Sequence, residues 1–324
     1  QQYEEYDFTP KFLLLEQKIK QEKRKRIIKR LSYAAILLPF IFAIWEIIQF
    51  QNQGTTPTEY SSIAPGSSRA ILTIGKDKTI YIERDSNINI HKIDSNVFIQ
   101  HNTLQYKKTA QATDNEIHKL NIPRGGEFFV CLSDGTKVWL NSESELKYAS
   151  EFVGEERRVY LTGEAYFEVT QDSLRPFLVE FEGACVKVLG TQFNVRAYPT
   201  GPSFTTLVSG CVKIVHKNQV LQLEPGQQCE VREEKMLLHN ADLMTVLAWK
   251  NGEFIFKDVA LETIMDELAR WYDMQVDYET EDLKKMRFYL YVERSENLEE
   301  VLQKIALTNQ VKYRVNGKKI IIQR

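Results

Sequence analysis

The sequence predicts three parts in order: a single-pass membrane helix, an all-β domain built as a sandwich or a stacked β architecture, and a small α+β domain of two βαβ-like repeats. Three observations predict this organisation. A basic stretch leads into an apolar run at residues 31–50, hydrophobicity then alternates with period two over residues 69–240, and residues 248–324 twice show strand, helix and strand patterns. A chain of 324 residues is long enough for two or three domains, each with its own core.

The apolar run LSYAAILLPFIFAIWEIIQF, residues 31–50, is 20 residues long. As a helix it would reach about 30 Å, the thickness of a bilayer core. Residues 11–30 carry nine Lys or Arg and two Glu, whereas the flexible linker at residues 51–68 carries no Lys or Arg. The positive-inside rule therefore puts the basic segment, residues 1–30, in the cytoplasm and everything after Phe50 outside, so the protein is a single-pass anchor with most of its mass beyond the inner membrane. A buried amphipathic core helix is the competing interpretation.

Glu46 interrupts this apolar run about one turn from its far end. Its carboxylate fits an interfacial position, from which it reaches water, and it also fits a proton or partner site within the membrane.

Residues 69–240 are predicted to form the all-β domain. Short alternating segments such as TIYIE and INIHKI, residues 88–93, are separated by turn residues, and no helical periodicity interrupts them. Asp134-Gly135 lies between FFVCLS and TKVWLN and is a strong hairpin signal. Gly190 and Thr191 interrupt what reads as one strand, LGTQFNV. The Gly-Thr peptide is either a bulge or kink, or a bond that is meant to break.

The α+β domain is predicted at residues 248–324. LETIMDEL and LEEVLQKI align with each other, and each carries one apolar stripe at helical spacing. Asn297 and Glu300 fit an N-terminal cap of the second helix. The predicted strands around these helices are 253–256, 275–278, 287–292, 311–315 and 319–322.

Few residues suggest catalysis, and no cofactor or metal site is predicted. The sequence has no phosphate-binding loop, no G-x-S-x-G and no H-E-x-x-H. Glu164 and Glu168 would lie about 13 Å apart along one strand, too far for a retaining glycosidase, so we expect them on a solvated strand face. A net charge of −2 argues against direct nucleic-acid binding. The histidines are scattered and are expected at the surface: His91, His101, His118, His216 and His239.

The four cysteines, Cys131, Cys185, Cys211 and Cys229, lie in the part expected outside the cytoplasm, where disulfides are permitted. Their spacing matches no metal or redox motif. A bridge between Cys185 and Cys211 and buried free thiols both fit the sequence.

A series of motifs resembles the FecR family of membrane-spanning anti-sigma factors, in the branch common in Bacteroidetes. In order they are IPRGGEF, LSDGTKVWLNSESELKY, RRVYLTGEAYFEV, PFLVE, VKVLGTQFNVRAY, LVSGCVKI and PGQQ, from about Ile122 to Val231. AWKNGEFIF and LETIMDELARWYDMQV resemble the C-terminal domain of the same branch, which is similar to the secretin/TonB short N-terminal domain.

The resemblance implies a signal relay. The periplasmic signalling domain of an outer-membrane TonB-dependent transporter, of the SusC-like or siderophore type, contacts the C-terminal domain, and the cytoplasmic segment controls an extracytoplasmic-function sigma factor. Some family members cleave themselves at the Gly-Thr bond that stands here as Gly190-Thr191. The sequence departs from the family at its front, where about 30 residues precede the apolar run and family members usually have a longer helical region.

Edge strands of the small C-terminal domain are the expected place for the transporter to bind, because an edge accepts a further strand. The residues predicted for this contact lie on two strands: Gln275, Val276 and Tyr278 on one, and Lys319, Ile320 and Ile322 on the other. The alternative function is a membrane-anchored, carbohydrate-binding β-sandwich, with Trp139 and Tyr148 as surface aromatics. A glycosidase ranks third, because it lacks a carboxylate pair.

Overall fold

The computed structural model describes residues 63–76, 78–83, 97–100, 103–106, 116–233, 235–308 and 310–324. The predicted membrane span at 31–50, the predicted strand at 88–93, His91 and His101 all lie outside these ranges. Within the ranges, no helix has both the length and the apolar character needed to cross a membrane.

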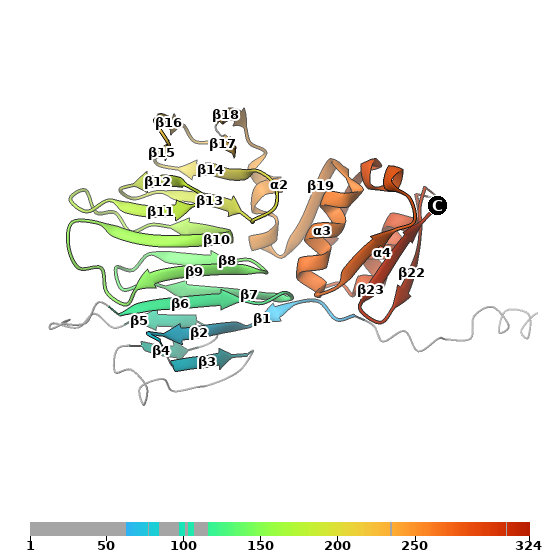
Figure 1. Ribbon diagram of the computed structural model, residues 1–324, viewed down its shortest axis with the longest axis horizontal. Helices are drawn as coiled ribbons and strands as arrows, with labels where there is room; N and C mark the ends of the chain where they lie inside the picture. The colour runs from blue at the N-terminus through green and yellow to red at the C-terminus, as the bar shows by residue number, and fades with distance from the viewer. Residues whose placement is uncertain are drawn as a thin grey trace, which may run out of the picture. The chain divides into compact units, whose positions relative to one another are not determined.

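The β domain consists of two sheets stacked face to face around one core, with their strands arranged as successive rungs (Figure 1). The first sheet runs in the order β3 (Lys78–Ile82), β2 (Ala70–Ile74), β6 (Ile117–Ile122), β9 (Ser144–Ala149), β10 (Arg157–Glu168), β11 (Phe177–Phe181), β12 (Ala184–Val188), β15 (Val212–His216) and β16 (Gln219–Leu223). The second runs in the order β4 (Val97–Gln100), β5 (Thr103–Tyr106), β7 (Gly126–Cys131), β8 (Lys137–Leu140), β10, β13 (Gln192–Ala197), β14 (Ser203–Ser209), β17 (Gln227–Arg232) and β18 (Lys235–Asn240).

Alternation of buried and exposed residues explains this fold. In β7 every second side chain is buried, as expected for a strand with one face on the core. Strand β10 joins the two sheets: its first half pairs with β9 and β11, and from Gly163 onward it pairs with β8 and β13. The alternating pattern predicts two separate strands here, Arg158 to Leu161 and Ala165 to Val169. The single strand β10 shows that the two sheets share one continuous backbone.

The C-terminal domain has its own hydrophobic core, separate from that of the β domain. Its elements are α2 (Leu243–Leu247), η2 (Trp249–Asn251), β19 (Glu253–Ala260), α3 (Leu261–Tyr272), β20 (Gln275–Tyr278), η3 (Glu281–Lys285), β21 (Arg287–Glu293), α4 (Leu298–Ala306), β22 (Lys312–Asn316) and β23 (Lys319–Gln323). The apolar stripes of α3 and α4 are buried against the strands, as their spacing predicts. The capping box of Asn297 and Glu300 is also confirmed.

The pairing of the C-terminal strands differs from the predicted βαβ-like repeats. In a βαβ unit the two strands lie parallel in one sheet. Here β19 pairs antiparallel with β21 of the other repeat, and β20 joins a separate sheet in the order β20, β23, β22. The repeated sequence therefore predicts the two helices and their flanking strands but not which strands pair.

Several predictions about exposure are wrong, and the structure decides between the two alternatives for the cysteines. All four cysteines are free, so Cys185 and Cys211 are not bridged. Two of the histidines expected at the surface, His118 and His216, are buried. His118 Nδ1 lies 2.7 Å from the Tyr106 hydroxyl, and both ring nitrogens of His216 bond to backbone carbonyls. Tyr148, expected as a surface aromatic, is buried in the β-domain core with its hydroxyl bonded to that of Tyr106.

Candidate functional site

Strand β20 is an open edge in the C-terminal domain. It pairs in parallel with β23 on one side, and no other strand among the described residues pairs with its second side. The backbone amide of Gln275 donates to the carbonyl of Lys318, just before β23, at 2.8 Å, and that of Glu279 donates to the carbonyl of Ile322 in β23 at 3.0 Å. Because alternate residues of a parallel strand face opposite neighbours, the backbone groups of Val276 and Tyr278 point to the open side.

The second predicted edge is wrong. Strand β23, which contains Lys319, Ile320 and Ile322, is the central strand of its sheet, with β20 on one side and β22 on the other. Ile320 and Ile322 are buried in the C-terminal core. Of the two predicted docking strands, only β20 has backbone groups available for a partner.

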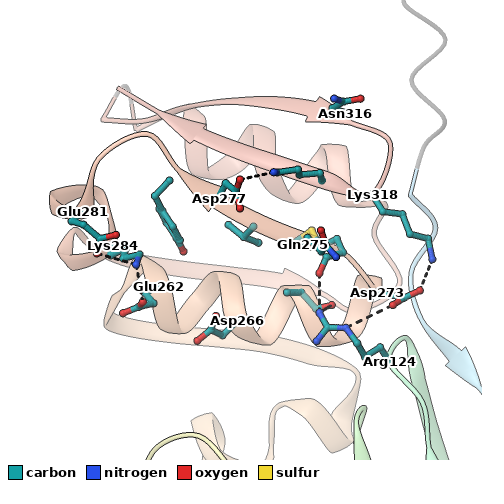
Figure 2. Close-up of a pocket in the computed structure, with 15 residues that line it drawn as sticks. Arg124, Glu262, Asp266, Asp273, Gln275, Asp277, Glu281, Lys284, Asn316 and Lys318 are labelled. Carbon is teal, nitrogen blue, oxygen red and sulfur yellow. Dashed lines mark hydrogen bonds and ion pairs between the residues drawn. The ribbon is translucent and has the colours of Figure 1, made fainter.

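A groove of about 1070 Å³ runs beside the open edge (Figure 2). Helix α3 forms one wall, β20 and the turn before β23 form the other, and η3 closes one end. Arg124 from the β domain lies at the opposite end, where its guanidinium donates to the carbonyls of Ala269 and Met274 at 2.7 and 2.8 Å. The groove therefore combines a strand edge with a helix face, an arrangement that accepts an extended peptide.

Most charges in the groove are already paired. Lys284 bridges Glu281 at 2.9 Å and Glu262 at 3.6 Å, and Lys319 pairs with Asp277 at 2.6 Å. Asp273 pairs with Lys318 and lies 3.7 Å from the Arg124 guanidinium. These pairs leave little net charge on the groove walls.

Asp266 is the groove carboxylate without an ion pair among the described residues, and no dashed line reaches it in Figure 2. Desolvation by the surrounding protein raises the pKa of its carboxyl, Glu262 and Glu267 raise it further, and Arg270 and Arg196 partly oppose the shift. An unpaired carboxylate in a groove favours a cationic side chain on whatever binds there.

The Tyr278 hydroxyl is a second unsatisfied group in this groove. Its oxygen is buried and has no hydrogen-bond partner among the described residues. Burial raises the pKa of Tyr278, and the nearby carboxylates of Asp266 and Glu262 raise it further, so the hydroxyl keeps its proton. A buried hydroxyl without a partner costs free energy, which a ligand that supplies an acceptor would recover.

The helix wall of this groove was not predicted from the sequence. Glu262 and Asp266 lie four residues apart, so they share one face of α3, away from its apolar stripe. This spacing was a readable signal. Asp273 is the C-cap residue that follows the helix and also lines the groove. The contribution of Arg124 had no local signal, because it lies 145 residues from Ala269 in sequence.

The Gly190-Thr191 peptide lies at a corner between the sheets, after the end of β12 and before the start of β13, and not inside a strand. A Cβ on Gly190 would lie 2.8 Å from the Cα of Gln171, so close backbone approach requires glycine here. Thr191 is buried, and its hydroxyl donates to the Cys211 carbonyl at 3.0 Å. This geometry explains the glycine and the hydroxyl by packing, and cleavage stays a prediction.

The features proposed for a carbohydrate site are covered or buried. The Trp139 ring lies against Phe129 and Tyr166, and the Lys250 ammonium lies 4.4 Å from the Trp139 ring centroid. A sugar would have to displace this cation from the aromatic face. Among the described residues, no group of three or more His, Cys, Asp or Glu is placed to hold a metal ion.

Glu164 is buried, which corrects its predicted place on a solvated strand face. Its carboxylate accepts from the side-chain amides of Asn141 and Asn194, each at 3.0 Å. Arg196 lies 3.7 Å from Glu164 and bonds to Glu267 of α3 at 2.7 Å. Glu164 thus belongs to a buried polar cluster that joins the β domain to α3.

The chain is thus a two-domain protein, with a two-sheet β domain followed by a small α+β domain that carries an open groove. Two family models match the chain: one described as FecR protein, over residues 118–213, and one described as FecR, C-terminal, over residues 253–322. Together they cover more than half of the sequence. The chain belongs to the FecR family, which confirms the predicted resemblance.

Two solved structures are similar to this chain, each of a candidate anti-sigma factor from Parabacteroides distasonis ATCC 8503. Both are 29% identical to it and cover 64% of its length, with TM-scores of 0.59 and 0.60. The match covers 98% of one of these chains and 99% of the other. No curated protein matches the sequence.

Proposed function

We propose that this chain is an anti-sigma regulator that relays a signal across the inner membrane. In this proposal residues 1–30 face an extracytoplasmic-function sigma factor in the cytoplasm, residues 31–50 cross the membrane, and the domains that follow lie in the periplasm. Membership of the FecR family and the similarity to candidate anti-sigma factors support the regulatory role. The charge distribution around residues 31–50 supports the orientation.

The signal enters at the groove between α3 and β20, where the periplasmic signalling domain of an outer-membrane TonB-dependent transporter adds a strand to the edge. The open side of β20 is the observation that carries this assignment. The backbone groups of Val276 and Tyr278 supply the ladder hydrogen bonds. A Lys or Arg of the incoming strand pairs with Asp266, and a carbonyl accepts from the Tyr278 hydroxyl.

The test is capture of partners by the full-length, tagged chain from native-host membranes. Wild type is compared with Val276→Pro, which removes an outward backbone N–H from β20. Val220→Pro is the matched control, because Val220 is exposed on β16, an edge of the first sheet, at a position whose N–H also points outward. We expect Val276→Pro to reduce transporter capture at least about tenfold, since it removes a ladder bond and blocks the register.

Two outcomes separate the parts of this proposal. Equal transporter capture by both proline variants would remove the β20 edge as the docking site. Capture of no sigma factor by the wild-type chain would contradict the anti-sigma role, whichever periplasmic partner is found.

Self-cleavage at Gly190-Thr191 is a further part of the proposal. The Thr191 hydroxyl would attack the Gly190 carbonyl carbon, the amide nitrogen would leave as an amine, and water would then hydrolyse the resulting ester to a carboxylate and a free hydroxyl. The two pieces would stay joined, because the β10–β13 and β12–β15 ladders both cross the cut. An immunoblot of the C-terminally tagged chain tests it.

A fragment beginning at Thr191 should appear in wild type and in Thr191→Ser, which keeps the hydroxyl, and disappear in Thr191→Ala. Full-length protein in all three would show that the Gly-Thr corner is structural only, and signalling would then pass through an unbroken chain.

A further inference from the structure

The segment Ile63–Arg69 contacts the C-terminal domain. Residues 63–68 fall within the flexible linker predicted at residues 51–68, but in the structure they pack against both domains and include strand β1. Ile63 packs against the C-terminal hydrophobic core. Its carbonyl accepts from the backbone N–H of Leu298, the first residue of α4, at 3.3 Å. A Cβ on Gly66 would lie 2.5 Å from the Trp271 ring, so the backbone runs directly over the indole at the end of α3.

The same segment is also bonded to the β domain. Ser67 and Ser68 form a two-residue strand, β1, parallel to Gly126 and Glu127 at the start of β7. The backbone amides of Ser67 and Arg69 donate to the carbonyls of Gly125 and Glu127 at 3.0 and 3.1 Å, and the Arg69 guanidinium donates to Gly125 at 2.8 Å. The segment therefore lies in a seam with β7 on one side and Trp271 on the other.

The seam shares its structural support with the groove. The backbone N–H of Gly125 donates to the Arg270 carbonyl of α3 at 2.7 Å. The neighbouring Arg124 donates to carbonyls at the end of α3 and also lines the groove beside Asp273. One turn, residues 123–126, thus binds both the end of α3 and the strand β1.

We propose that this seam is an intramolecular docking site, and that its ligand is the chain's own segment Ile63–Arg69, bound as a short detachable strand. The site fits an extended backbone whose amides at Ser67 and Arg69 point toward β7. It also requires a residue without a side chain over Trp271, and Gly66 meets that requirement. Few hydrogen bonds hold β1, so this segment opens at a lower free energy than the two cores.

The role of the seam rests on the proposed function. In that role, the seam couples the groove to the part of the chain that leads to the membrane. A partner in the groove that contacts Asp273 or shifts Arg124 changes how α3 meets the turn, and hence how tightly the segment is bound. Such coupling requires the partner to bind the closed and open seams with different affinity.

The test uses hydrogen exchange and limited trypsin digestion of the purified full-length chain. Gly66→Val places side-chain atoms against Trp271, and Ala64→Val is the matched control, because Ala64 is exposed two residues away. In wild type and Ala64→Val we expect the amides of Ser67 and Arg69 to exchange at least about tenfold more slowly than in Gly66→Val, with Arg69 resistant to trypsin in the first two.

Ser67→Pro is a second variant, which removes one bond to β7 without adding bulk over the indole, and it should also release the segment. Amides of β8 and β23 report that both domains remain folded in each variant. Equal exchange of the segment amides in wild type, Gly66→Val and Ser67→Pro would overturn the docked strand. Because this test needs neither transporter nor sigma factor, it fails or succeeds separately from the proposed function.

Discussion

Helices α3 and α4 begin from similar sequences, LETIMDEL and LEEVLQKI, but depend on different contacts. The first turn of α4 is capped by its own Asn297 and Glu300, whereas α3 follows Ala260, which provides no side-chain cap. At its other end α3 receives hydrogen bonds from Arg124 and Gly125 of the β domain. Helix α4 thus has a local cap and one remote hydrogen bond, from Leu298 to Ile63, while α3 lacks a side-chain cap and is held at its end by residues of the β domain. This difference makes α3 the element that can transmit a change between domains.

The largest losses of stability are expected from truncation of the core side chains that α3 and α4 both contribute. Leu268 of α3 and Ile305 of α4 align with each other and are both buried in the C-terminal core. We expect Leu268→Ala and Ile305→Ala each to lower the free energy of unfolding by about 2–5 kcal/mol, because each leaves a cavity. Urea unfolding of the full chain measures this. A cost below about 1 kcal/mol for either variant would mean that the two repeats do not build one core.

Smaller losses of stability are expected from variants at the C-terminal end of α3 and at the N-terminal end of α4. Arg124→Ala removes the donor to two carbonyls at the end of α3, and we expect a loss of about 1–3 kcal/mol in unfolding free energy. Asn297→Ala removes the cap of α4 and should cost about 1 kcal/mol. Hydrogen exchange distinguishes them further. Arg124→Ala should speed exchange in β1 and at the end of α3, whereas Asn297→Ala should speed exchange at the start of α4, where Leu298 contacts Ile63, and leave the end of α3 unchanged. Identical exchange patterns would contradict the division between remote and local support.

The smallest expected effect concerns Asp266. Asp266→Asn should weaken partner binding about threefold to tenfold at low salt, and less at high salt, because it removes one partly screened charge. Glu155→Gln, an exposed carboxylate change in the β domain, is the control. Unchanged affinity, or the same loss in Glu155→Gln, would exclude a specific pairing with Asp266.

Asp266→Asn is expected to weaken partner binding but to raise the stability of the folded chain, because of the pKa of Asp266. Its folded-state pKa is raised, so the folded protein holds the proton more tightly than the unfolded chain. Stability from this group is present below the unfolded pKa of about 3.9 and is lost as pH rises through the folded value. Asp266→Asn should therefore raise the melting temperature slightly at pH 7, with no difference below about pH 4. A lower melting temperature at pH 7 would assign Asp266 a structural role.

Local patterns predicted much of this fold. Period two predicted the β domain, helical spacing predicted α3 and α4, and the strand Gln275–Tyr278 has the same bounds in the structure. Pairing was not predictable, because it depends on contacts between distant residues. The sequence therefore indicated β20 and β23 equally as edges, although β23 lies in the middle of its sheet.

The functional surface was predicted only in part. The strand edge was predicted because a small repeat domain leaves edge strands that can accept another strand, but the groove also needs α3, Arg124 and the unpaired Asp266. The exposure of Glu164 was also predicted incorrectly. Its four-residue spacing from Glu168 suggested a solvated face, whereas packing against Asn141 and Asn194 buries it. Burial of a polar residue depends on partners that a local pattern does not contain.

The most direct test of the central claim is site-specific photo-crosslinking of the full-length chain in its native host. A photoreactive residue replaces Gln275, exposed on β20 beside the groove, or Val220, exposed on β16. We expect position 275 to crosslink to the periplasmic domain of an outer-membrane transporter and position 220 not to do so. A transporter crosslink from position 220, with none from position 275, would contradict docking at the β20 edge.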